Sequence, residues 1–396
     1  MQLALRNGST DAGRPVSLTL KDGYIADLSP TSDTPGVDLG GRLLLPGLVD
    51  AHVHLDKTLL GRSWTPHAPG TDVAARVANE KRLRLGADWD VGLQGEALLQ
   101  RLVEAGSTTV RTHVDIDETV LLENLRAVLA LRERWAERVT LQIVAFPQSG
   151  ILNCPGMPDL LNAALCEGAD VVGGLDPVGF DRDEDGHLDT VFSLAERHGK
   201  SVDIHLHDGG EVGLRELRNI AARTQALGMS GRVVVSHAYA LAEANWDDFQ
   251  TTAGALARAG VSIVTSVPGE RTIPPISRMA EMGLNLALGS DNIRDTWSPM
   301  SVASMMERAM LAAYRSGYRL DDQLRSCLDL SVVGGARALG LTPGEIAPGA
   351  AADLIVVDAP NIPAAVMERP LPDLVIRRGR IIIDKLGLTE SLRLSG

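Results

Sequence analysis

Histidines at metal-binding spacing follow several apolar runs of this chain, the first of which begins at Leu43 and ends in His52-Val53-His54. Side chains alternate along a β-strand, so both imidazoles are expected on the same strand face. Two histidines on one strand make half of a metal site, and other strands must supply the remaining ligands. Three later apolar runs end in suitable residues, which are His205 with His207, His237, and Asp291. The sequence therefore predicts a metal site assembled from several strand ends.

Between residues 46 and 345, apolar β-rich runs alternate with longer helix-like segments, the pattern that builds a parallel sheet or a closed barrel. Two of the expected helices span 219–227 and 305–314. Eight runs end in polar residues, which are His54, Asp115, Gln148, Asp176, His207, His237, Ser266 and Asp291. Because the carboxyl ends of barrel strands meet at one mouth, where active sites lie, we predict an α/β fold with a catalytic (β/α)8 TIM-type barrel over 46–345.

The two ends of the chain have a different pattern. Residues 1–45 and 346–396 contain short alternating runs that read as strands, and Lys21-Asp22-Gly23 is a hairpin signal. We expect both ends to pair into one small β-sandwich beside the barrel.

Composition narrows the class of protein. The chain has 396 residues and a formal net charge of −13, which disfavours nucleic acid and anionic membranes as partners. Its three cysteines form no CxxC pair, so a reducing cytoplasm is expected rather than a disulfide framework. No run reaches the roughly 18 apolar residues that a membrane span needs. A soluble cytoplasmic protein with a small, uncharged substrate fits best, and the sequence leaves a homo-oligomer open.

Several motifs together resemble the amidohydrolase superfamily, and within it the cytosine-deaminase-like branch. The resemblance covers nearly the whole chain, and its motifs occur in the family's order. Asp56-Lys57 after the first His-x-His, and His-x-His-Asp at 205–208, are closer to the triazine-degrading members than to cytosine deaminase itself. The other matching motifs are Arg-Thr-His-Val-Asp at 111–115, Gln-Ile-Val-Ala-Phe-Pro-Gln at 142–148, Gly-Ala-Asp-Val-Val-Gly-Gly at 168–174, Ser-His at 236–237, Ser-Asp-Asn at 290–292 and Gly-Ala-Ala-Ala-Asp-Leu-Ile-Val-Val-Asp at 349–358.

The resemblance implies one divalent metal ion with water completing its shell. The implied ligands are His52, His54, His205 and Asp291. Family members with two metals bridge them by a carboxylated lysine from strand three or four, and residues 141–180 of this chain contain no lysine. Imidazole and carboxylate ligands suit zinc or iron, with manganese as a further option. A mononuclear site is expected.

The implied activity is hydrolytic removal of an amino or alkylamino group from a nitrogen heterocycle, such as a cytosine-like pyrimidine or an aminotriazine. Asp291 would accept the proton of the attacking water, and His237 would stabilise the developing charge. Gln148 and Asn292 would hydrogen-bond the ring edge. Trp297 either stacks on the ring or packs in the core, and His113 either contacts substrate or supports a metal ligand.

The chain departs from cytosine deaminase at the proton shuttle. That enzyme has a glutamate three residues after the strand-five ligand, whereas this chain has Asp208 there, preceded by His207. We therefore expect His207 and Lys57 to protonate the leaving amine jointly, with Asp208 as the alternative shuttle.

Two other functions stay open. A hydrolase of cyclic amides or N-acyl compounds would use the same metal chemistry, and a non-catalytic binding protein could use the same barrel. The alternative role of Asp291 is purely structural, as a helix N-cap. Residues 181–187, which include His187, are expected to form a solvated turn, and His198 is expected to be a cation at a helix end.

Overall fold

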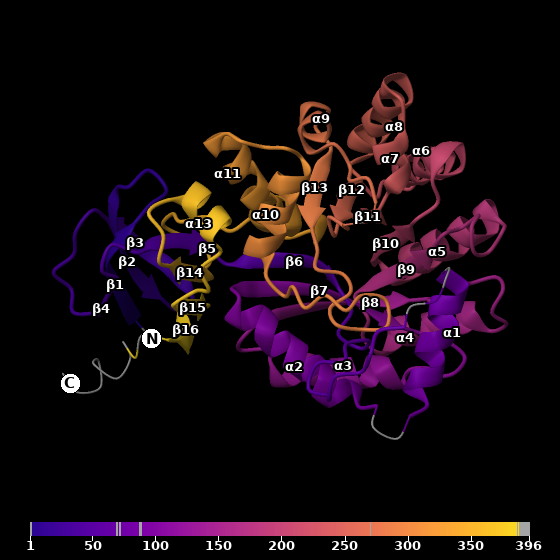
Figure 1. Cartoon of the computed structure of the whole chain (residues 1–396), viewed down its shortest axis with the longest axis horizontal. Helices are drawn as coiled ribbons and strands as arrows, with labels where there is room; N and C mark the ends of the chain where they lie inside the picture. Colours follow the sequence, from indigo (N-terminus) through magenta and orange to yellow (C-terminus); the bar gives the residue numbers. More distant parts are fainter. Residues whose placement is uncertain are drawn as a thin grey trace.

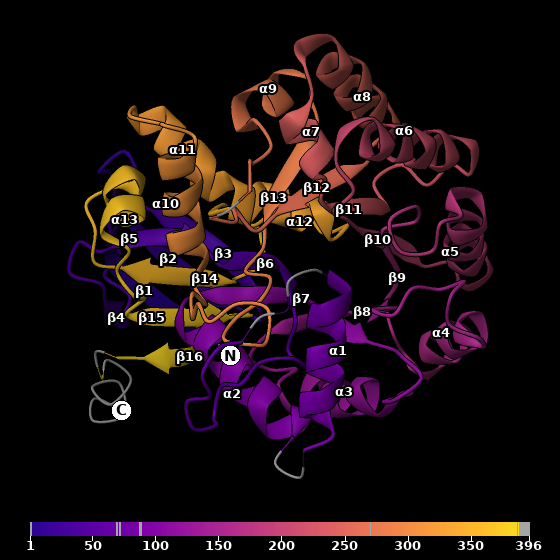
Figure 2. The same cartoon turned by 45° about the vertical axis from the view of Figure 1, so that its right-hand side comes forward.

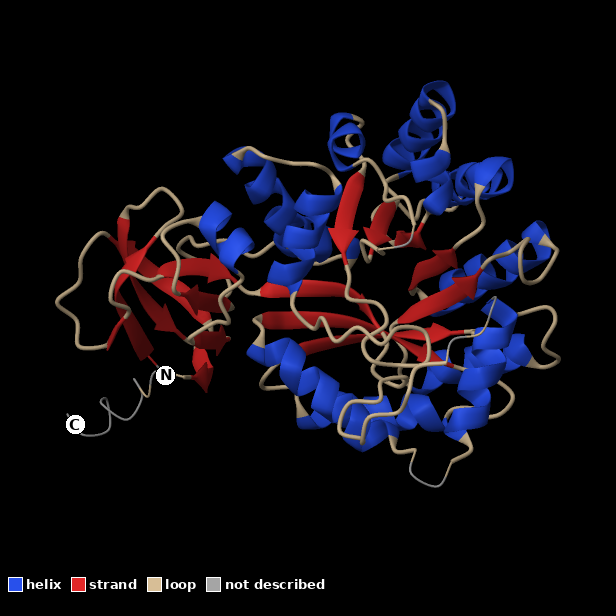
Figure 3. Cartoon of the chain, viewed as in Figure 1, coloured by secondary structure: helices blue, strands red, loops and turns tan. Residues whose placement is uncertain are grey.

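The computed structural model describes residues 2–385 and 387, apart from residues 69, 71, 72, 87, 88 and 270. Two eight-stranded sheets organise this part of the chain. Figure 1 shows a small β-rich body, built from both ends of the chain, beside a larger body in which helices surround strands. The colouring by secondary structure in Figure 3 separates these two bodies clearly. Within the described residues, none of the helices is both long and apolar enough to cross a membrane.

The larger body is a closed parallel barrel, as predicted. Each strand pairs in parallel with its neighbour in chain order. The barrel closes where Asp291 N–H donates to the carbonyl oxygen of His52 at 2.7 Å and Val53 bridges Asp291. Its strands are β6 (Leu48–Val53), β7 (Ser107–Asp115), β8 (Thr140–Phe146), β9 (Val171–Leu175), β10 (Ser201–Leu206), β11 (Val233–His237), β12 (Ser262–Thr265) and β13 (Asn285–Leu288).

Helices cover the outside of this barrel (Figure 2). Local capping sets several of their ends: the Asp183 and Asn245 side chains accept from backbone N–H groups three residues on, and Gly199 and Gly260 end the same two helices in the left-handed conformation. The segments predicted as helices at 219–227 and 305–314 fall almost wholly in α6 and α10. The helices are α1 (Val73–Arg84), α2 (Val91–Glu104), α3 (Glu123–Arg134), α4 (Met157–Glu167), α5 (Glu184–His198), α6 (Gly210–Ala226), α7 (Tyr239–Glu243), α8 (Trp246–Ala259), α9 (Ile276–Glu281), α10 (Met305–Arg315), α11 (Asp321–Asp329), the π-turn η1 (Leu330–Gly334) and α12 (Gly335–Ala338).

The smaller body is a mixed sheet from the two chain ends, as expected, with the order β16-β15-β14-β5-β1-β2-β3 and β4 paired to β1. Asp22 and Gly23 form the β2–β3 turn with positive φ at both positions, the conformation that a two-residue hairpin favours. Ile25 exchanges backbone hydrogen bonds with residues 349 and 350, so the sheet curves around its own apolar core. The elements are β1 (Gln2–Ser9), β2 (Pro15–Lys21), β3 (Tyr24–Ser29), β4 (Val37–Asp38), β5 (Leu43–Pro46), β14 (Leu354–Val357), α13 (Ile362–Glu368), β15 (Leu374–Arg377) and β16 (Arg380–Asp384).

The expectation of a solvated turn at residues 181–187 is wrong. His187 lies in the first turn of α5 and is fully buried, with its Nδ1 atom 2.7 Å from the Asp181 carboxylate. The aspartates of this segment are used locally instead: Asp183 caps α5, and Asp181 also accepts from the backbone N–H of Ile151. His198 is the last residue of α5, as expected.

Candidate active site

The predicted metal ligands gather at the carboxyl ends of three barrel strands. His52 and His54 come from the end of β6, His205 from β10, and Asp291 from the loop after β13. The three histidines are buried. Asp291 has a φ of 59°, and the hydrogen bond from its N–H to His52 fixes it against β6. The residues that follow Asp291 are not helical, so the alternative of a helix N-cap is wrong.

Three of these side chains meet at one point. The Nε2 atoms of His52 and His54 are 3.4 Å apart, and each is 3.5 Å from Oδ1 of Asp291. The His205 ring lies 4.6 Å from the His52 ring and 5.5 Å from the His54 ring, measured between centroids. The His237 ring is 5.2 Å from that of His205. One cation could contact His52 Nε2, His54 Nε2 and Asp291 Oδ1 together, with the His205 ring beside it.

The protonation and hydrogen bonding of these residues fit a metal ion. Within the described residues, both ring nitrogens of His205 and the Nδ1 atoms of His54 and His237 are buried without a hydrogen-bonding partner. Burial and the Lys57 charge lower the pKa of His54 to about 4, and burial with neighbouring imidazoles holds the pKa values of His205 and His237 well below the ordinary value. Neutral imidazoles are the ligand form, and an ion would compensate one unpaired ring nitrogen of His205.

Asp291 is the charged member of the set. Burial alone would favour its neutral form, but the neighbouring side chains of His52, His54 and His237 hold its pKa well below the ordinary value. A neutral histidine group with one carboxylate is the donor set expected for zinc, iron or manganese.

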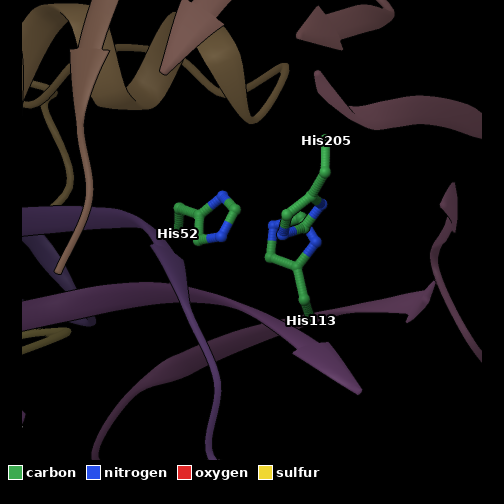
Figure 4. A group of neighbouring side chains, drawn as sticks. All are labelled: His52, His113 and His205. Carbon is green, nitrogen blue, oxygen red and sulfur yellow. The ribbon is translucent and has the colours of Figure 1, made fainter. Parts of the chain in front are cut away.

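His113 lies below the ligands instead of along the cavity wall. Figure 4 shows the His52, His113 and His205 rings converging from three strands. The His113 ring stacks on His52 at 3.9 Å between centroids, and its Nε2 atom is 3.7 Å from Asp203. One ring nitrogen of each of His52, His113 and His205 lies within 4.8 Å of the others, so His113 could also offer a ligand atom, and both roles predicted for it stay predictions.

A cavity with about 340 Å³ of empty space, part of it open to solvent, lies next to the ligands. The structure brings nine of the predicted site residues to its wall, where Phe146 and Leu175 supply apolar surface. Those nine are His54, Lys57, Gln148, His205, His207, His237, Asp291, Asn292 and Trp297.

Lys57 is buried at one end of this cavity. Its Nζ atom donates to Oε1 of Gln148 at 2.7 Å, lies 3.0 Å from Asp115, and is within 6 Å of the ring centroids of Phe146 and Trp297. Because Gln148 accepts this bond through its oxygen, its amide nitrogen can donate into the cavity that the residue lines.

The network behind Lys57 includes a helix that sequence reasoning did not connect to the site. Glu80 of α1 lies 3.7 Å from Lys57 Nζ and accepts from the indole N–H of Trp297. Arg84, one turn later, pairs with Glu80 and with Asp115. In the sequence this Glu–Arg pair at four-residue spacing is indistinguishable from a surface ion pair. The structure buries it at the barrel mouth.

His207 also lines the cavity. It follows β10, and its Nδ1 atom is 2.9 Å from Oδ2 of Asp176, while its ring stacks on His237 at 4.4 Å. Burial opposes protonation of His207, but the charge and hydrogen bond of Asp176 raise its pKa. Asn292 lies near the metal point and donates to Asp295 at 2.6 Å, so its side-chain oxygen is left to accept a hydrogen bond.

Asp208 is directed away from the described cavity wall. Its Oδ2 atom accepts from the backbone N–H of Gly179 at 2.7 Å. Burial and the nearby Asp176 charge raise its pKa. A shuttle role for Asp208 stays a prediction, but His207 is the residue of this pair that lines the cavity.

Comparison with known proteins agrees with this arrangement. The model of the family described as "Amidohydrolase family" matches residues 86–383. N-isopropylammelide isopropyl amidohydrolase of Pseudomonas sp. (strain ADP) is 31% identical over 354 residues, covering 88% of this chain and 87% of that protein. The crystal structure of N-isopropylammelide isopropylaminohydrolase from Burkholderia multivorans is 38% identical with a TM-score of 0.93, covering 97% of this chain and 98% of that one.

A second enzyme of the same branch is also similar. The structure of 5-methylcytosine deaminase from Klebsiella pneumoniae with 5-fluorocytosine is 27% identical with a TM-score of 0.85, covering 96% of this chain and 97% of that one. The resemblance that the motifs predicted is therefore confirmed. The chain belongs to the amidohydrolase family, whose members hydrolyse C–N bonds.

Proposed function

We propose that this protein is a mononuclear metal-dependent hydrolase that removes an amino or alkylamino group from a pyrimidine or triazine ring. The observation that carries the proposal is the meeting of His52, His54 and Asp291 within 3.5 Å of one another beside a cavity lined by His207 and Lys57. The similarity to enzymes named for N-isopropylammelide and 5-methylcytosine supports the substrate class.

His52, His54, His205 and Asp291 would hold the ion. When bound, zinc, iron or manganese supplies an acidified water molecule near neutral pH, since it lowers the pKa of that water from 15.7 to about 7. A single ion is proposed because β8 and β9 carry no lysine that could bridge two.

Asp291 would accept the proton of the attacking water, because it is held as a carboxylate at the point where the ligands meet. His237 lines the same side of the cavity as a neutral imidazole, and it would donate a hydrogen bond to the charge that develops on the attacked ring.

His207 and Lys57 would supply the proton that leaves with the amine. Both side chains reach the cavity, and each is held by a carboxylate, Asp176 for His207 and Asp115 for Lys57. Such pairing orients each donor, which is what protonation of a poor nitrogen leaving group requires.

The polar groups of the cavity are complementary to an oxo-substituted ring. Lys57 and the amide of Gln148 offer hydrogen-bond donors at one end, and the free oxygen of Asn292 offers an acceptor near the metal point. A ring with a carbonyl oxygen on one edge and an N–H on another would satisfy both.

The proposal is tested with a panel of aminated and alkylaminated pyrimidines, triazines and purines on protein whose metal content has been quantified. Loss of ultraviolet absorbance must coincide with release of one ammonia or amine per ring. Ring opening without amine release would assign the protein to cyclic-amide hydrolysis instead. Metal-loaded protein that turns over none of these compounds would favour a binding function.

A further inference from the structure

A layer of charged and polar residues lies beneath the metal ligands inside the barrel. Arg111 of β7 donates from its guanidinium to Oδ2 of Asp203 on β10 at 2.8 Å. The hydroxyl of Ser236 on β11 donates to Oδ1 of the same carboxylate at 2.8 Å. Ser236 Oγ is also 2.8 Å from Nδ1 of His52. All of these residues are at most 1% exposed.

Stability alone does not account for this layer. The interiors of such barrels are filled mainly by branched apolar side chains, and a buried ion pair is often no more stabilising than apolar residues of the same volume. Arg111, Asp203 and Ser236 also connect strands that are distant in sequence. The last of their contacts, from Ser236, is to His52, a predicted metal ligand.

The directions of the hydrogen bonds follow from the donor inventory. A carboxylate only accepts, so the single hydroxyl proton of Ser236 points to Asp203. The lone pair of Ser236 then faces His52, and the short contact requires the proton to be on Nδ1 of His52. In this tautomer the Nε2 lone pair is free. Nε2 is the atom that faces His54 and Asp291 at the metal point.

We propose that Arg111, Asp203 and Ser236 form a positioning relay that holds His52 in the Nδ1–H tautomer with Nε2 directed to the metal. Arg111 compensates the buried charge of Asp203 and fixes the carboxylate, Asp203 orients the Ser236 hydroxyl, and Ser236 orients the imidazole. The proposal rests on the metal-dependent function proposed above. These residues are positioning residues, since they reach the site only through His52.

The first measurement is the zinc dissociation constant, obtained by competition with a chelator. Ser236→Ala removes the acceptor of the His52 proton and should weaken zinc binding about 10- to 100-fold, the usual loss when the partner of a metal-bound histidine is removed. Ser262→Ala is the matched control, because Ser262 is a buried barrel serine on β12 that bonds Asn285 and touches no ligand. It should change the constant less than twofold. Ser236→Thr keeps the hydroxyl and should bind more tightly than the alanine variant.

The second measurement needs no metal. Long-range ¹H–¹⁵N correlation spectra of the metal-free protein report the tautomer of His52, which should be Nδ1–H in the wild type and mixed in Ser236→Ala. The double variant Arg111→Met with Asp203→Leu removes the relay without leaving an unpaired buried charge. It should weaken zinc binding to the same extent as Ser236→Ala, because the freed hydroxyl can then donate to Nδ1.

The outcomes separate this relay from the proposed function. Equal zinc constants for wild type, Ser236→Ala and the double variant would overturn the relay and leave the hydrolase assignment standing. If Ser236→Ala does not fold, the double variant decides in the same way. A wild type that binds no zinc, iron or manganese would overturn the proposed function, and the spectra would still support the relay if His52 is Nδ1–H, or refute it if His52 is Nε2–H.

Discussion

Glu216 predicts a specific dependence of stability on pH. It lies on α6 and is buried, and its Oε1 atom accepts from the backbone N–H of Val178, in the loop that follows Asp176. Burial, and then the negative charge of Asp208, raise the pKa of Glu216 from 4.5 to about 8. Below pH 8 the folded protein therefore holds a neutral carboxyl group here, behind the pair of His207 and Asp176.

The sign of the effect follows from proton binding. Between about pH 5 and pH 8 the folded state holds this proton and the unfolded state does not, so this group's stabilisation is complete below the unfolded pKa and is lost as pH rises through 8. In this range the free energy of unfolding falls by about 1.4 kcal/mol per pH unit, and the range from about pH 5 to pH 8 limits the total loss to roughly 4 kcal/mol. With an unfolding entropy of about 2.1 cal/mol/K per residue, a loss of about 2 to 4 kcal/mol corresponds to a fall in Tm of about 2 to 5 °C.

The assay is thermal unfolding from pH 5 to pH 8.5 for the wild type and Glu216→Gln. The glutamine keeps an oxygen for Val178 and cannot ionise, so the Tm of the wild type relative to the variant should fall by about 2 to 5 °C across this range. Taking the difference cancels the titration of the site histidines. Glu211→Gln, at an exposed position of the same helix, is the control and should run parallel to the wild type. A Tm difference between wild type and Glu216→Gln that does not change with pH would refute the reasoning.

Three further predictions concern the site. His205→Ala should reduce bound metal from about one equivalent to almost none, as measured by elemental analysis. The control His198→Ala, at the end of α5, should retain the metal. Two tightly held metals in the wild type would contradict a mononuclear site. Gln148→Leu should lower kcat/KM about 5- to 150-fold, or roughly 1 to 3 kcal/mol, without loss of metal, and unchanged kinetics would leave Gln148 a structural role. His207→Asn should lower kcat by about two to four orders of magnitude, whereas Asp208→Asn should lower it less; the reverse order would favour a carboxylate shuttle.

The barrel was predictable because its strands are mainly apolar runs that end in polar residues. A parallel strand covered on both faces leaves an uninterrupted apolar run, and the polar tip marks where the chain reaches the mouth. The strand ends in the structure lie within three residues of the predicted ends, for example Thr265 for Ser266 and Leu288 for Asp291. The two-residue spacing of His52 and His54 likewise predicted that both imidazoles lie on the same face of their strand.

The contacts that orient those residues were not predictable in the same way. Arg111 sits in a strand whose pattern indicates only that it is buried, and its partner Asp203 is 92 residues away. Beyond the last paired residue of a strand, alternation no longer fixes direction. β10 ends at Leu206, so the turn of the chain, and not periodicity, directs His207 into the cavity and Asp208 toward Gly179.

In the proposed reaction, the charges of the site would favour departure of the amine once it has formed. Asp291 is the carboxylate at the metal point, and the imidazoles around it are held neutral, so a divalent ion would leave this end of the cavity positively charged. Lys57 adds a positive charge at the cavity wall, although Asp115 lies 3.0 Å and Glu80 3.7 Å from its Nζ atom. A released alkylamine or ammonia is a cation in neutral water and would be repelled from such a cavity, whereas a ring with carbonyl oxygens would be attracted to it. In the proposed reaction, the same field that would acidify the water would therefore also separate the two products.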